Sequence, residues 1–164
     1  AGDTPKKMID ENILSVVADS DHAYPNRNFW IQTIHRGLSM ENNGVKKSLT
    51  APLYHALEKG NGNDASKVYR ELKKSNPDEY GFNENVLNTL GYYLLGKNRL
   101  EDAVTIFKLN VKEYPKSFNV YDSLGEAYMN KGSLWRARRN YKKSIRINPK
   151  NQNGLDMLEK LSSQ

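Results

Sequence analysis

Residues 84–117 read ENVLNTLGYYLLGKNRLEDAVTIFKLNVKEYPKS, and residues 118–151 read FNVYDSLGEAYMNKGSLWRARRNYKKSIRINPKN. The second stretch repeats the residue classes of the first at an offset of 34 positions. Seven pairs agree in class: Leu87/Tyr121, Leu90/Leu124, Gly91/Gly125, Leu94/Tyr128, Ala103/Ala137, Phe107/Tyr141 and Pro115/Pro149. Agreement that includes paired glycines, alanines and prolines indicates an internal repeat, and such repeats decide the fold.

Each unit predicts two helices joined by a turn. In the first unit the apolar residues fall at helical spacing in two stripes, Leu87, Leu90, Leu94 and Leu95, then Ala103, Ile106, Phe107 and Val111. In the second unit the stripes are Tyr121, Leu124, Ala127 and Tyr128, then Leu134, Ala137, Tyr141 and Ile145. Asn98 followed by Glu101 matches a capping box at the start of a helix, and Ser117 and Ser133 are predicted N-caps.

Gly91 and Gly125 lie inside predicted helices, where glycine costs about 1 kcal/mol relative to alanine. We expect close approach of the paired helix to offset that cost. Ala103 and Ala137 would keep the gap between the helices narrow.

The 34-residue period with Leu-Gly, Ala, Phe/Tyr and Pro at these offsets resembles the tetratricopeptide repeat (TPR). The resemblance implies an all-α fold, an antiparallel helix-pair α-solenoid with N-terminal helices and a C-terminal capping helix. Residues 84–117 and 118–151 are the two well-matched repeats. Asn110 and Ser144 depart from the family pattern, which has alanine at that position.

The flanking residues fit the pattern less well. Residues 49–83 are a degenerate repeat with helices predicted near 51–59 and 64–74, joined through Gly60–Asn63, which we expect to be a long, flexible turn. Residues 152–164 are a predicted capping helix, with Asn151 as N-cap and Leu155, Leu158 and Leu161 on its apolar stripe. Residues 1–48 fit no repeat and are predicted to be helices that pack on the array, although 13–18 equally suits a strand.

Composition excludes several classes of protein. The 164 residues contain no cysteine, which rules out disulfides, thiol catalysis and Cys-ligated metals. No apolar stretch approaches the ~20 residues of a membrane span. The three histidines, His22, His35 and His55, lack metal-site spacing, and no GxSxG, SxxK or phosphate-loop motif occurs. We therefore expect no enzyme activity, metal or cofactor.

The first residue is not Met, and we expect a processed chain or a segment of a longer protein.

The TPR resemblance also implies where a ligand would bind, because first helices line the concave side of such arrays. In these units that side would carry seven residues, which we call the first-helix row: Asn85, Asn88, Tyr92, Asn119, Asp122, Glu126 and Met129. Asparagine amides suit a peptide backbone, and tyrosine and methionine give adaptable apolar contact. Carboxylate-clamp TPRs use Lys and Arg there, so that specialisation is not expected.

A basic block is the strongest charge feature. Residues 1–83 carry 11 basic and 11 acidic side chains and residues 84–164 carry 14 and 8, so the net charge of +6 comes from the second part. Six cations lie on the predicted second helix of the last repeat and form what we call the basic face: Arg136, Arg138, Arg139, Lys142, Lys143 and Arg146. A solvated outer surface is the favoured interpretation, with binding of an anionic partner as the alternative, which Trp135 supports.

The predicted function is a non-enzymatic scaffold that binds a protein or peptide partner. One alternative is binding of nucleic acid or an anionic polymer through the basic face. Another is an accessory tail of a hydrolase, because residues 50–151 resemble TPR tails found C-terminal to bacterial serine hydrolase or esterase domains. Self-association and the compartment, cytoplasmic or periplasmic, are left open.

Overall fold

The chain divides into two compact units, Ala1–Val45 and Lys46–Gln164. The computed structural model describes residues 46–163. Except for residues 46–48, the predicted N-terminal helices and the alternative strand at 13–18 lie outside the described residues, as do His22 and His35.

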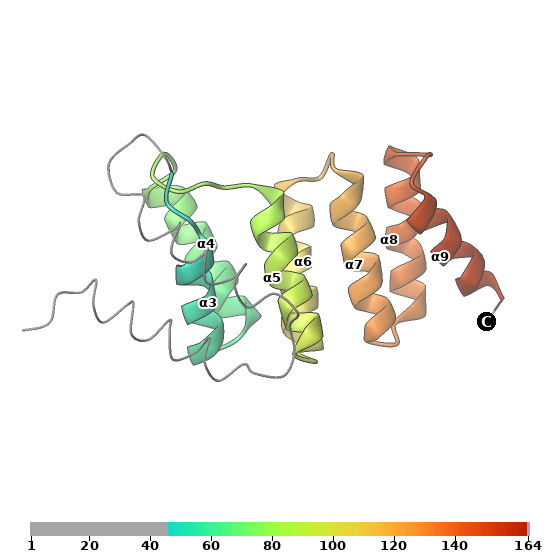
Figure 1. Ribbon diagram of the computed structural model, residues 1–164, viewed down its shortest axis with the longest axis horizontal. Coiled ribbons are helices and arrows are strands. Elements are labelled where there is room, and N and C mark those ends of the chain that lie inside the picture. The colour runs from blue at the N-terminus through green and yellow to red at the C-terminus, as the bar shows by residue number, and fades with distance from the viewer. Residues whose placement is uncertain (1–45, 164) are drawn as a thin grey trace, which may run out of the picture. The chain divides into compact units, whose positions relative to one another are not determined.

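Helices make up most of the described residues, and they stand side by side along the unit (Figure 1). They are α3 (Thr50–Lys59), α4 (Gly62–Ser75), α5 (Glu84–Gly96), α6 (Leu100–Glu113), α7 (Phe118–Asn130), α8 (Leu134–Ile147) and α9 (Gln152–Ser162). Helices α5 and α7 begin 34 residues apart, and so do α6 and α8. Among residues 46–163, extended pairing is limited to an isolated bridge between Lys47 and Tyr80. The predicted all-α helix-pair fold is confirmed.

The core runs between the paired helices. Leu87 and Leu94 of α5 are fully buried, as are Ile106 and Phe107 of α6 and Tyr141 of α8. Each such side chain contributes about 1.5–3 kcal/mol through burial. Tyr121 was predicted on the apolar stripe of α7, but Val120 takes the buried place. Tyr121 lies at the margin, where its hydroxyl donates to the Pro115 carbonyl at 3.2 Å.

Gly91 of α5 and Gly125 of α7 accommodate aromatic rings of the paired helices. A Cβ at Gly91 would stand 2.4 Å from the Phe107 ring, and a Cβ at Gly125 would stand 2.9 Å from the Tyr141 ring. Both distances are shorter than van der Waals contact. The prediction of close approach is therefore confirmed, and the approaching group is an aromatic ring.

Asn98 does not begin α6. It adopts a left-handed backbone conformation with φ of 57°, and its N–H donates to the Leu95 carbonyl, which ends α5. The N-cap of α6 is Arg99, without a side-chain capping bond. The prediction of a capping box at Asn98 was wrong because asparagine, which tolerates left-handed geometry, suits a helix end as well as a helix start. Gly132, with φ of 74°, has the corresponding position in the next unit.

The turn between α3 and α4 is short and tightly held, which corrects the prediction of a long, flexible loop. A true capping box forms here: Asn61 caps the backbone and Asp64 accepts from the Asn61 N–H at 3.0 Å. Gly62 packs on Asp102 of α6, where an added Cβ would come within 3.0 Å of the backbone. Close packing, rather than flexibility, explains this glycine.

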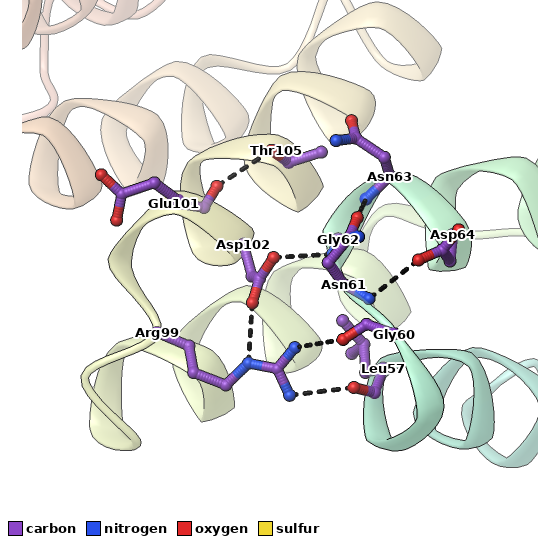
Figure 2. Close-up of polar contacts among 10 residues, drawn as sticks. All are labelled: Leu57, Gly60, Asn61, Gly62, Asn63, Asp64, Arg99, Glu101, Asp102 and Thr105. Carbon is purple, nitrogen blue, oxygen red and sulfur yellow. Dashed lines mark hydrogen bonds and ion pairs between the residues drawn. The ribbon is translucent and has the colours of Figure 1, made fainter.

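Arg99 and Asp102 connect this turn to α6, as Figure 2 shows. The Asp102 carboxylate accepts from the Gly62 N–H at 2.7 Å and from the Arg99 Nε at 2.7 Å. The Arg99 guanidinium also donates to the carbonyls of Leu57 at 3.0 Å and Gly60 at 3.1 Å. Arg99 and Asp102 thus provide hydrogen-bond partners for the carbonyls at the end of α3 and for the first N–H of α4.

Helix α9 covers the end of α8. Leu161 is buried and Leu158 partly so, whereas Leu155 is 40% exposed, contrary to its prediction as a stripe residue. Asn151 is the N-cap but makes no capping bond, and Ser117 and Ser133 make none either. None of the helices between residues 46 and 163 has the length and apolar character needed to cross a membrane.

Candidate functional site

Two members of the first-helix row meet across the repeat boundary. The Tyr92 hydroxyl of α5 donates to Glu126 Oε2 of α7 at 2.8 Å and lies 3.3 Å from Ser123 Oγ. Residues 92 and 126 are 34 positions apart, so they are equivalent in consecutive repeats. Tyr92 is 38% exposed. Equivalent positions of the first helices α5 and α7 are therefore in direct contact across the repeat boundary.

The row continues toward α9 through Asp122. One oxygen of this carboxylate accepts from Asn151 Nδ2 at 2.8 Å and the other from Asn153 Nδ2 at 2.5 Å. On the opposite side, Asn119 Nδ2 donates to Glu84 Oε1 at 3.4 Å. The row is thus held by hydrogen bonds from α5 through α7 to the start of α9.

The other predicted members differ in their surroundings. Asn85 is exposed, and Met129 is partly buried against the core. The Oδ1 of Asn88 is buried without a hydrogen-bond partner among the described residues, and so is the hydroxyl of Tyr141. A buried polar atom without a partner costs free energy.

The electrostatics of the row are those of an acidic surface. Burial raises the pKa of the Tyr92 phenol to about 12; the Ser123 hydrogen bond opposes this shift and the Glu126 charge adds to it. Burial also raises the pKa of Tyr141, with further contributions from the charges of Glu126 and Asp122. Both phenols are therefore neutral near neutral pH, and the Tyr92 hydroxyl donates to the Glu126 carboxylate.

The six residues of the basic face line a pocket of about 730 Å³ on α7 and α8, together with Tyr121, Tyr128, Trp135 and Asn140. No carboxylate lines it. Among residues 46–163, no ion pair involves any of the six cations. Arg138 does reach the Leu161 carbonyl of α9, which marks one border of the face.

Aromatic rings lie under three of these cations. Arg136 stands 5.7 Å from the Tyr128 centroid, Lys143 5.7 Å from Tyr121, and Arg139 5.8 Å from Trp135. Trp135 is 68% exposed. These are cation–π distances, so the rings hold the charged groups in place.

Sequence reasoning missed Tyr121 and Tyr128 as lining residues because both were assigned to the apolar stripe of the first helix. The sequence did contain a signal. Tyr121 and Tyr128 are seven residues apart on the first helix, and the cations Arg136 and Lys143 have the same spacing on the second helix. Asn153 was missed as well, since it follows a predicted N-cap. Within residues 46–163, no three His, Asp or Glu side chains gather closely enough to hold a metal ion.

The described helices thus define a TPR-like α-solenoid, and comparison with known proteins agrees. Residues 118–151, which contain α7 and α8, match the family model described as tetratricopeptide repeat. The first TPR domain of the human RPAP3 protein is 17% identical, with a TM-score of 0.50, over 70% of this chain and 87% of that one.

The second TPR domain of human RPAP3, in complex with the HSP70 peptide SGPTIEEVD, is 15% identical, with a TM-score of 0.50, over 71% of this chain and 93% of that one. At these identities the likeness shows the fold alone. No curated protein sequence matches this chain significantly.

Proposed function

We propose that this chain is a non-enzymatic helical-repeat module that binds a peptide segment of a partner protein along the first-helix row. The observation that carries the proposal is the Tyr92–Glu126 contact, because it joins equivalent positions of consecutive first helices into one surface. Repeat arrays present extended binding surfaces in this way.

The chemistry of the row suits a peptide in extended form. Asn85 and Asn119 offer amide donors and acceptors to a peptide backbone. Tyr92 and Met129 add apolar contact area. Since the charged members are the carboxylates Asp122 and Glu126, we propose a neutral or basic peptide rather than one held by its own carboxylates.

The peptide complexed with the second RPAP3 TPR domain, SGPTIEEVD, contains two glutamates and an aspartate. A peptide of that charge would meet like charge at Asp122 and Glu126. The partner proposed here is therefore of a different class.

The proposal is tested by selecting peptides from a random-sequence library on the full chain and measuring their affinity. Glu126→Lys reverses a charge of the row and is expected to weaken a selected peptide at least about tenfold, the loss typical of a charge-assisted contact. Glu71→Lys, on the exposed surface of α4, is the matched control and should leave affinity unchanged. Equal losses in both variants, or selected peptides that are all acidic, would overturn the proposal.

A further inference from the structure

A second surface of opposite sign lies on α8. On a helical wheel, the six cations of the basic face occupy the arc opposite the buried residues Ala137, Tyr141 and Ser144. The arc is bordered by α9, where Arg138 meets the Leu161 carbonyl, and by α7, where Arg136 meets Tyr128. The face is therefore a bounded strip and not a scatter of surface charge.

Ordinary solvation does not account for this strip. Exposed cations on protein surfaces usually alternate with carboxylates, yet residues 131–150 contain eight Lys or Arg and no acid. One of these eight, Lys131, lies outside the basic face and pairs with Glu101 of α6 at 2.7 Å. The strip keeps its charge uncompensated within residues 46–163, which favours an anionic partner.

The rings distinguish between classes of anionic partner. One face of each of three rings already holds a cation, which leaves less ring surface on which nucleotide bases could stack. A guanidinium stacked on a ring keeps its N–H edge available, and that edge pairs with a carboxylate through two parallel bonds. Trp, Tyr and Arg together are also the residues that dominate protein–protein contacts.

The length of the strip agrees with a peptide. Residues 136, 139, 143 and 146 span about 15 Å along α8 at 1.5 Å per residue. An extended chain covers that distance in roughly five residues at about 3.3 Å each. Carboxylates at alternate positions of such a chain would lie on one side, facing the cations.

From this geometry we infer that the basic face of α8 docks an acidic peptide segment of a partner protein, whose three carboxylates at alternate positions pair with cations among Arg136, Arg139, Lys143 and Arg146. This surface differs from the first-helix row both in its position and in the sign of its charge. The inference goes beyond the proposed function, and either of the two can fail while the other stands.

Fluorescence anisotropy on the full chain tests the inference with three labelled probes: a short peptide of Asp, Glu, Gly and Ser, its Asn/Gln counterpart, and a uridine oligomer of equal length. The acidic peptide is expected to bind at least about tenfold more tightly than the neutral one, and less tightly as salt rises. Tighter binding of the uridine oligomer would overturn the assignment to a peptide, and equal binding of the two peptides would overturn the site.

Variants locate the binding. Arg139→Gln with Lys143→Gln should weaken the acidic peptide at least about tenfold, because two charged contacts are lost. Lys108→Gln with Lys112→Gln removes the same charge from exposed positions of α6 and should change affinity less than about twofold. Trp135→Ala should weaken binding about two- to fivefold, since Arg139 loses its ring. Equal losses in the α6 control would show charge attraction without a site and would contradict the inference.

Discussion

The ring of Phe107 lies so close over Gly91 that a methyl group on residue 91 would come within 2.4 Å of it. Phe107 is fully buried and also packs edge-to-face on Tyr92 at 5.3 Å between centroids. The ring therefore has little room to move away. This contact allows the close approach of α5 and α6 at Gly91 and supports the ring of Tyr92 in the first-helix row.

Gly91→Ala should destabilise the protein by about 1–3 kcal/mol, because steric strain exceeds the gain of about 1 kcal/mol in helix propensity. Gly125→Ala should cost less, since its Cβ would be 2.9 Å from the Tyr141 ring rather than 2.4 Å. Urea denaturation of the two variants measures both effects.

Phe107→Leu provides the control for this prediction. It should cost less in the Gly91→Ala background than in the wild type, with a coupling of about 1 kcal/mol, because a smaller side chain relieves the clash. A Gly91→Ala variant as stable as the wild type would show that the ring does not hold α5 and α6 apart.

Asp102→Ala should cost about 1.5–3 kcal/mol, since the carboxylate accepts from both the Gly62 N–H and the Arg99 guanidinium. Glu71→Ala breaks a 3.9 Å pair on the exposed face of α4 and should stay within about 0.5 kcal/mol of the wild type. Urea denaturation measures both variants. Comparable losses in the free energy of unfolding would mean that Asp102 does not stabilise the junction between α3 and α4.

Asn151→Ala should loosen α9. The Asn151 amide donates to Asp122 Oδ1 and to Ser144 Oγ, both at 2.8 Å, and so ties the start of α9 to α7 and α8. Hydrogen exchange of the α9 amides is expected to accelerate, while α5 and α6 keep their protection. Asn140→Ala removes an exposed amide on α8 and serves as control. Unchanged hydrogen exchange of the α9 amides in Asn151→Ala would show that Asn151 does not anchor the start of α9.

High pH should weaken the fold through Tyr92. Its folded pKa of about 12 lies above the ordinary value near 10, so the folded state holds the phenolic proton more tightly than the unfolded state. This contribution to stability is complete below about pH 10 and is lost as pH rises from about 10 to about 12. A difference absorbance titration between wild type and Tyr92→Phe should show one phenol titrating near pH 12. A difference titrating near pH 10 would contradict the buried environment of Tyr92.

The sequence was sufficient to predict the helix pairs of residues 84–151, because the 34-residue spacing of Gly91, Phe107 and their equivalents has a direct steric cause. It was insufficient at the turns. The turns at Asn98 and at Gly60–Asn63 consist of residue types that suit several backbone conformations. Only tertiary contacts, such as that of Asp102 with Gly62, select one of these conformations.

For the candidate sites, the sequence could predict which residues share a surface but not which of them are in contact. Helical periodicity places residues on a face, which was enough to predict the basic face, whereas the first-helix row followed from the TPR resemblance. Periodicity does not show contacts between elements. The Tyr92–Glu126 bond and the rings of Tyr121 and Tyr128 under the cations required the structure.

The central claim is that consecutive first helices form one peptide-binding surface, and amide chemical-shift mapping of a library-selected peptide on the full chain tests it most directly. The account predicts that the largest shifts cluster on α5 and α7 around Tyr92 and Glu126 and extend to Asn153. Shifts that cluster on α4 and α6 instead, with α5 and α7 unchanged, would contradict it.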